Sequence, residues 1–236
     1  MVRRLAFLPK PLFFLFLVVL MAGGGYLFYS VSDPLKAIEP QELFQKALTR
    51  TKAAKSYSYR LRSCLVTPQG TRCLSDLNGR RILPDKVCVK GKVFNAPVEI
   101  IQVGGTTYIK DCFSPKWLIF EGDRLGGTGV FLTELDPLVL LDFAEVPVVD
   151  RKEKGRGKNK DLYLLAFKPR VKNRFLAAQF TDFAYRLSVE PKEYYIRQVE
   201  VQARSKKAPT KLLLNLDLGD FDRVQGIEPP ADVSPQ

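Results

Sequence analysis

The stretch YSYRLRSCL, residues 57–65, decides the fold. Tyrosine or leucine occupies every second position except 63, and polar residues or cysteine stand between them. Successive side chains of a β-strand point to opposite faces, so this period of two predicts a strand with one apolar and one wet face. Strands of that kind are typical of antiparallel sheets.

The same period of two recurs along the chain. Asn78-Gly79 and Gly104-Gly105 are dipeptides that favour hairpin turns. Together these patterns predict about ten antiparallel strands, which form a strongly curved sheet, or incomplete β-barrel, when they share one apolar face. Besides residues 57–65, the predicted strands are 87–93, 98–103, 106–110, 117–120, 146–149, 161–167, 183–189, 194–204 and 212–218.

Three segments carry helical signals instead. Pro40 begins an apolar pattern of helical spacing that ends near Lys55, and residues 171–178 form a shorter one. Residues 128–144 are apolar almost all round and contain Asp136-Pro137, a typical helix start. A helix without a polar face must be buried or close over something apolar. The predicted fold class is therefore α+β, with helices covering the concave face of the sheet.

The N-terminal segment carries the signals of a membrane helix. Residues 11–32 form a window of 22 residues without a charge, and Arg3, Arg4 and Lys10 precede it. About 20 apolar residues suffice to cross the hydrocarbon core, and a basic flank stays in the cytoplasm, so the rest of the chain lies outside. A cleaved signal peptide is the alternative, and it exports the chain equally. We favour an uncleaved anchor because the window exceeds the usual apolar core of a signal peptide, about 7–15 residues.

These patterns give a simple domain organisation. Residues 1–32 are the predicted signal-anchor or transmembrane segment, residues 33–38 a linker, and residues 39–231 the extracytoplasmic domain. Residues 232–236 are a predicted disordered tail. The expected location is the cell membrane, as a single-pass protein, or outside the cell if the first segment is cleaved.

The composition argues against catalysis. The sequence contains no histidine, which excludes Ser-His-Asp and Cys-His nucleophiles as well as histidine metal ligands. Asp217, Asp220 and Asp222 cluster near the C-terminus, but on a wet strand face and a turn, where solvated aspartates are expected. We therefore predict no enzyme, no catalytic residue, no metal site and no cofactor.

The basic residues are concentrated in two places. Lysine and arginine number 37 against 25 acidic residues, a net charge of +12. Residues 151–174 hold ten basic and two acidic residues, hence +8, and the N-terminal flank adds +3. We interpret residues 151–160 as an exposed hairpin loop that anionic lipid attracts, with a merely solvated loop as the alternative. Nucleic acid is not expected, because the loop lacks aromatic residues for stacking. The candidate membrane-surface patch is Lys152, Lys154, Arg156 and Lys158.

The four cysteines lie in the exported part and are candidates for disulfide bonds: Cys64, Cys73, Cys88 and Cys112. Cys73 can pair with Cys64 around the turn at residues 68–70, or with Cys88 around Asn78-Gly79. We favour Cys64–Cys73, which leaves Cys88–Cys112, and four unpaired thiols are the alternative.

The register of the first hairpin contains a conflict. A two-residue loop at Pro68-Gln69 puts Cys64 opposite Cys73, but it also puts Leu65 opposite Arg72, which is poor packing. A loop one residue longer fits the apolar pattern better and misaligns the cysteines. The sequence alone leaves both registers open.

Several short motifs are spread over residues 43–231. They are Ala47-Leu48, Thr51, Ala54, Ser56-Tyr57, Val98-Glu99-Ile100-Ile101, Thr107-Tyr108-Ile109-Lys110, Trp117, Leu132, Leu135-Asp136-Pro137-Leu138, Asp220-Phe221-Asp222 and Ile227-Glu228-Pro229-Pro230-Ala231. In this order and spacing they resemble the LolA/LolB-type lipoprotein-carrier superfamily, most closely its LppX/LprG-like branch of lipid-binding envelope proteins.

The resemblance implies an incomplete, strongly bent antiparallel barrel whose helices cover an apolar cavity for acyl chains, without catalysis. Two features depart from the family pattern. Many relatives carry a lipidated N-terminal cysteine where this chain has a predicted helix, and the four cysteines are not shared. The same architecture also serves envelope-stress sensors that bind protein partners.

We therefore expect a membrane-anchored extracytoplasmic protein that binds a lipid or lipoprotein acyl chain in an apolar cavity, for carriage or presentation at the cell envelope. Apolar burial supplies the affinity. The alternative is an envelope interaction or stress-sensing module of the same fold that binds a protein partner without carrying lipid. The candidate cavity and lid residues, assigned from alternation, are Tyr59, Leu61, Trp117, Phe131, Leu135, Leu138, Leu141, Tyr185, Leu187, Leu212 and Leu214.

Overall fold

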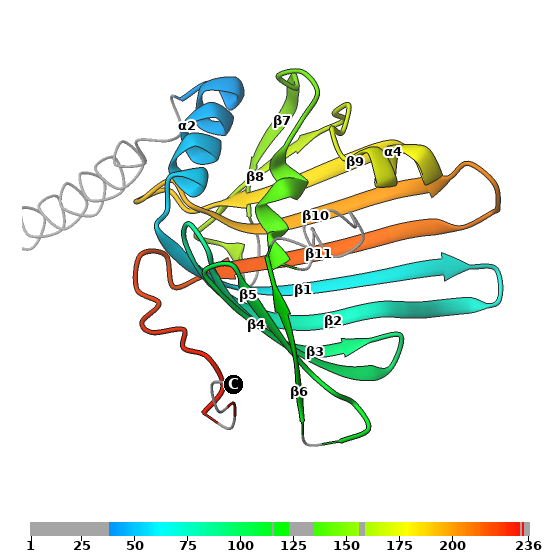
Figure 1. The fold of residues 1–236 in the computed structure, drawn as a ribbon. Coiled ribbons are helices and arrows are strands. Elements are labelled where there is room, and N and C mark those ends of the chain that lie inside the picture. Colours follow the sequence, from blue (N-terminus) through cyan, green and yellow to red (C-terminus); the bar gives the residue numbers. More distant parts are fainter. Residues whose placement is uncertain (1–37, 115, 123–134, 156–158, 232, 234–236) are drawn as a thin grey trace, which may run out of the picture. The chain divides into compact units, whose positions relative to one another are not determined.

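The computed structural model describes residues 38–114, 116–122, 135–155, 159–231 and 233. An antiparallel sheet of eleven strands dominates this part of the chain, in the order β6-β5-β4-β3-β2-β1-β11-β10-β9-β8-β7 (Figure 1). The sheet stays open, with β6 and β7 as its edges. The predicted antiparallel sheet is therefore confirmed, with eleven strands in place of about ten.

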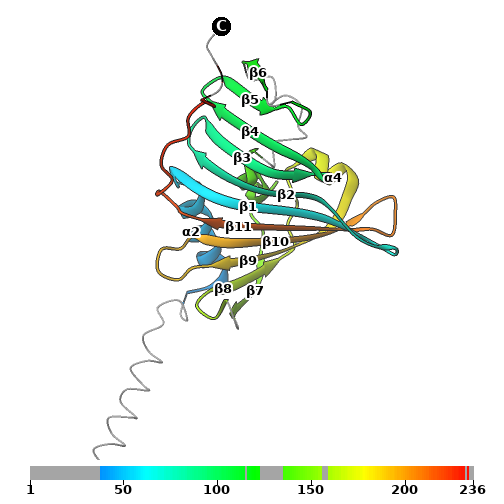
Figure 2. The same cartoon turned by 90° about the horizontal axis from the view of Figure 1, so that it is seen from below.

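Every pair of neighbouring strands is consecutive in the chain except β1 and β11, which lie side by side in the middle of the sheet (Figure 2). The chain runs outward from β1 to the β6 edge and returns from the β7 edge to β11. The elements are α2 Pro40–Lys52, β1 Ser56–Thr67, β2 Gly70–Ile82, β3 Lys86–Val93, β4 Ala96–Val103, β5 Thr106–Lys110, β6 Trp117–Glu121, η2 Pro137–Leu141, β7 Val149–Lys154, β8 Tyr163–Phe167, α4 Arg174–Gln179, β9 Phe180–Val189, β10 Ile196–Ser205 and β11 Lys211–Gly219.

A β-bulge resolves the register conflict of the first hairpin. Near the turn Cys64 pairs with Cys73 and Leu65 with Arg72, as a two-residue loop requires. The register then shifts by one residue between Ser63 and Cys64, so Leu61 lies opposite Leu77. The bulge thus keeps the cysteines aligned at the tip and the apolar residues aligned in the body of the hairpin.

The predicted turn at Asn78-Gly79 is wrong, because both residues lie inside β2. The glycine serves a close approach instead: a Cβ at position 79 would lie 2.1 Å from Cζ of Tyr59, which is opposite in register. A glycine inside a strand commonly marks such contacts. The turn follows Ile82, and the Gly104-Gly105 turn between β4 and β5 is confirmed.

Within the described residues the helices are shorter than predicted. Helix α2 ends at Lys52 and buries Leu43, Phe44, Ala47 and Thr51. Within residues 136–144 the predicted helix is a 3₁₀ turn, η2, and the third predicted helix is α4, six residues capped by the Asn173 side chain. Residues 128–134 of the same predicted helical segment lie outside the described part.

Strand β7 also differs from the prediction, which placed a strand at 146–149 and a loop at 151–160. The strand runs from Val149 to Lys154 and pairs with β8. Val146 and Val148, 68% and 77% exposed, precede it. A charged strand at a sheet edge resists pairing with other chains.

No helix within the described residues is long and apolar enough to cross a membrane. The predicted anchor at residues 1–32 lies outside them, so it stays a prediction.

Candidate functional site

One face of the sheet carries most of the buried apolar side chains, and we call it the inner face. A continuous apolar row crosses it, since Leu61 lies between Leu77 and Leu216, and Val199 lies between Leu216 and Leu187. All five side chains are at most 1% exposed. The inner face also includes Tyr57, Tyr59, Val89, Ile100, Leu165, Phe167, Tyr185, Val201, Leu212, Leu214 and Leu218.

The inner face contains a polar pair that satisfies itself. Ser63 and Ser75 lie opposite each other on β1 and β2, and their hydroxyl oxygens are 2.7 Å apart. Both residues are buried, at 8% and 3% exposure. A buried hydroxyl is costly only when it lacks a partner, so this pair leaves the face apolar in effect.

Residues 135–143, the covering segment, lie against the inner face and are pinned at their first end by Asp136. The Tyr57 hydroxyl donates to Asp136 Oδ1 at 3.2 Å, and Arg81 Nη2 lies 3.3 Å from Asp136 Oδ2. Arg81 Nη1 also donates to the Leu135 carbonyl at 3.0 Å. Burial, and then the neighbouring Asp136 carboxylate, raise the pKa of Tyr57, so this hydroxyl remains a donor.

An aromatic cluster holds the other end of the covering segment. The ring of Phe143 lies 5.4 Å from Tyr185, 5.6 Å from Phe167 and 6.0 Å from Phe44 of α2, between ring centroids. Edge-on and tilted packing of this kind adds to the free energy of apolar burial. Burial in this cluster raises the pKa of Tyr185. This part of the inner face is therefore filled by protein side chains.

The middle of the covering segment is apolar but unevenly buried. Leu140 and Leu141 are 2% and 0% exposed, whereas Leu138 and Val139 are half-buried. Three polar contacts at one end and three ring contacts at the other thus fix a segment whose centre keeps partly accessible apolar side chains.

The structure brings most of the predicted site residues together. Tyr59, Leu61, Tyr185, Leu187, Leu212 and Leu214 share the inner face, and Leu135, Leu138 and Leu141 belong to the covering segment. Phe131 lies outside the described residues.

Trp117 is on the opposite face, so the prediction that it lines the cavity is wrong. Ile109, inner by its pairing with Ile100, faces Leu118, and the next pair, Lys110 and Trp117, points outward. Lys110 Nζ lies 5.6 Å from the Trp117 ring centroid. The short strand 117–120 gave no internal signal of which of its faces is inner.

The candidate membrane patch is only partly described. Lys152 and Lys154 lie in edge strand β7 and not in a loop, and Lys152 Nζ lies 5.8 Å from the Tyr163 ring centroid. Arg156 and Lys158 lie outside the described residues.

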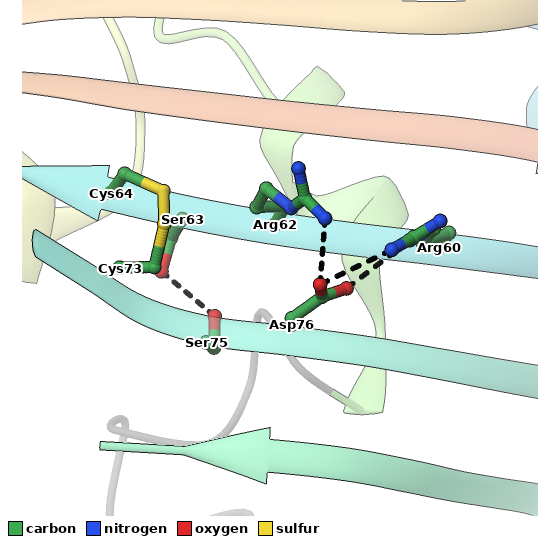
Figure 3. The surroundings of a disulfide bond; sticks show 7 residues. All are labelled: Arg60, Arg62, Ser63, Cys64, Cys73, Ser75 and Asp76. Carbon is green, nitrogen blue, oxygen red and sulfur yellow. Dashed lines mark hydrogen bonds and ion pairs between the residues drawn. A yellow bond between two sulfur atoms is a disulfide. The ribbon is translucent and has the colours of Figure 1, made fainter. Parts of the chain in front are cut away.

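The outer face carries the disulfide bond, Cys64–Cys73, as favoured from the sequence (Figure 3). The expected Cys88–Cys112 bond is wrong, because both thiols are unbonded. Beside the disulfide, Asp76 accepts two hydrogen bonds from Arg60 and one from Arg62 (Figure 3). These bonds lower the pKa of Asp76.

Two of the C-terminal aspartates, Asp220 and Asp222, have structural partners. Asp220 accepts from the Ser58 hydroxyl at 2.6 Å, and Asp222 accepts from the Lys55 backbone N–H at 2.7 Å and from the Tyr195 hydroxyl at 2.9 Å. The hydrogen bond from Lys55, with the smaller effect of Tyr195, lowers the pKa of Asp222. These carboxylates dock the chain after β11 onto the start of β1.

Sequence reasoning missed Arg81 and the Phe44–Phe143–Phe167 contacts. Arg81 was hidden because Asn78-Gly79 signalled a turn where β2 continues. The aromatic contacts join residues far apart in the chain, so no local period reveals them.

No protein-family model matches this chain, and no curated protein matches it. Among solved structures, LprF from Mycobacterium bovis is similar with a TM-score of 0.50 and 12% identity, over 81% of this chain and 97% of that one. Lipoprotein LppX from Mycobacterium tuberculosis is similar with a TM-score of 0.49 and 10% identity, over 80% of this chain and 98% of that one. A LolA superfamily protein from Nitrosomonas europaea is similar at 0.35 and 11%, over 78% and 94%.

The likeness to LprF covers nearly all of that protein and 81% of this chain. At 12% identity it concerns the arrangement of the chain and not its ligand. The comparison thus shows that this chain shares the fold of LprF.

Proposed function

We propose that this chain is a non-enzymatic binding protein of the cell envelope that holds an acyl chain between the inner face and the covering segment. The observation that carries the proposal is the covering segment itself, which is pinned at both ends but only half-buried at Leu138 and Val139. A segment of this construction lets an apolar chain enter beneath its centre while its ends stay in place.

The expected affinity follows from apolar burial alone. Each buried CH₂ group contributes about 0.8 kcal/mol, so about ten of them supply roughly 8 kcal/mol, which corresponds to a micromolar dissociation constant before losses in entropy. Such a ligand needs few directional hydrogen bonds. The ligand site is proposed under the part of the segment between Asp136 and Leu141, away from the filled aromatic cluster.

We further propose that residues 1–32 anchor the protein in the membrane with the sheet outside the cytoplasm. The Cys64–Cys73 disulfide supports this placement, because disulfides persist in oxidising compartments. Carriage or presentation of a lipid at the envelope suits a protein that holds its ligand next to the membrane.

Replacing Leu138 with aspartate tests the proposed site. A charge at this half-buried position should lower the affinity for a pyrene-labelled fatty acid at least tenfold, about 1.4 kcal/mol, because it must be desolvated against the acyl chain. Val146→Asp, at a position 68% exposed, is the matched control and should bind normally. Equal binding by both variants and the parent contradicts the site.

A specific observation also favours the second candidate, a module that binds an envelope protein. Edge strand β6 exposes three consecutive apolar residues, Leu118, Ile119 and Phe120, at 49%, 46% and 36%. An apolar edge strand is a template for a partner's strand. A photo-cross-linker at position 118 should give one discrete adduct in cells, which Ile119→Lys abolishes. Equal labelling from exposed position 146 contradicts a β6 site.

A further inference from the structure

A pocket of about 830 Å³ lies where β8 ends and β9 begins, and its walls combine positive charge with apolar surface. Its apolar wall includes Val171, Phe180 and the buried Phe183. One acidic residue, Asp182, lines it. Five basic residues line it as well, and we call this region the basic pocket: Lys168, Arg170, Arg204, Lys206 and Lys211.

The basic residues reach this pocket from three separate parts of the chain. Lys168 and Arg170 belong to the basic run 151–174, whereas Arg204 and Lys211 lie opposite each other on β10 and β11. The run therefore does not act as one patch, because its later part joins residues more than thirty positions away.

The positive charge of the basic pocket is only partly compensated. Arg204 Nη1 lies 3.9 Å from Asp182 Oδ2. Arg170 Nε lies 4.0 Å from Glu145 Oε1, which is the upper distance limit for an ion pair. Lys206 donates to the Ala177 carbonyl at 2.7 Å. Within the described residues, Lys168 and Lys211 have no carboxylate partner.

The pocket also adjoins the covering segment. Ala144, which follows Phe143, lines the pocket, and its backbone N–H donates to the Arg170 carbonyl at 2.9 Å. The end of the covering segment and the basic wall are therefore joined by a backbone hydrogen bond. The pocket thus adjoins the filled, aromatic end of the covering segment and not its centre.

We propose that the basic pocket binds an anionic amphiphile, with its phosphate or carboxylate on the basic residues and its first methylene groups on the pocket's own apolar wall. This inference goes beyond the proposed function, because the pocket is a second site whose ligand class is anionic amphiphiles. Charge-assisted hydrogen bonds from lysine and arginine hold such head groups, and the apolar wall accepts the first methylene groups of the chain. An inorganic anion has no methylene groups to contact the apolar wall, so it should bind more weakly.

Alkyl probes with and without a charge test the inference on the full chain. The protein is kept in a surfactant with a fluorinated tail, which mixes poorly with hydrocarbon, and titrated calorimetrically with decyl phosphate, decanoate, decanol and inorganic phosphate. Decyl phosphate and decanoate should bind at least tenfold more tightly than decanol, and inorganic phosphate more weakly than decyl phosphate.

The double variant Lys168→Gln/Lys211→Gln should lower the affinity for decyl phosphate at least tenfold. It should change the affinity for decanol less than twofold. Lys92→Gln/Lys116→Gln, two exposed lysines outside this pocket, is the matched control and should change neither.

Unchanged decyl phosphate binding in the first double variant overturns the head-group site, while continued decanol binding leaves the proposed function intact. Binding of inorganic phosphate as tight as that of decyl phosphate also overturns the inference, since the pocket is then an anion site only. If no alkyl probe binds, the proposed function fails as well.

Discussion

Tyr59 and Gly79 face each other across β1 and β2, and the contact shows how tightly single residues of this sheet depend on their neighbours. Tyr59 is 4% exposed, and its ring occupies the space that any Cβ at position 79 would need. A glycine in an Asn-Gly dipeptide can serve a hairpin turn or a close contact inside a strand, and the dipeptide alone does not distinguish the two. The predicted turn failed for this reason, because the partner ring lies twenty positions earlier in the chain.

Gly79→Ala should destabilise the protein by about 1–3 kcal/mol, since the new methyl group forces the buried Tyr59 ring to move. Urea unfolding measures the change. Gly105→Ala, where a Cβ meets nothing within 4 Å, is the control and should stay within about 0.5 kcal/mol of the parent. A Gly79→Ala variant as stable as the control shows that the ring relaxes without cost.

At the scale of elements, the covering segment shows what a sequence pattern reveals and what it omits. Its apolar character and the start at Asp136-Pro137 predict a buried segment, and the structure has one. Within residues 136–144 the predicted helix is nevertheless a 3₁₀ turn, Pro137–Leu141, because Arg81 and Tyr57 fix one end of the segment and the Phe44 cluster the other. The residues that hold the two ends lie elsewhere in the chain, so the sequence of the segment itself does not indicate them.

Asp136→Ala should loosen the first end of the covering segment. It leaves the Tyr57 hydroxyl and the Arg81 guanidinium, 18% exposed, without this partner, at a cost of about 1–3 kcal/mol. Hydrogen exchange of residues 135–143 should therefore be faster. Asp142→Ala is the control, because its ion pair with Lys52 is exposed and contributes at most about 1 kcal/mol. Similar exchange in both variants contradicts the role of Asp136.

At the scale of the whole molecule, alternation predicted most strands of the sheet, because apolar and polar residues alternate in a strand with one buried face. The strand order follows from pairing β1 with β11, a contact between residues more than 140 positions apart. Alternation likewise placed Leu61, Leu187 and Leu214 on one face but could not orient the isolated strand that holds Trp117. The basic pocket was beyond prediction because it joins Lys168 with Lys211 only after folding.

The central claim is that this sheet holds an acyl chain. Native mass spectrometry of the full chain, extracted from membranes into a surfactant with a fluorinated tail, tests the claim most directly. We predict a bound species with the mass of an acyl lipid, retained by Val146→Asp and lost from Leu138→Asp. A protein that is folded and carries no lipid in either variant or in the parent would contradict the account.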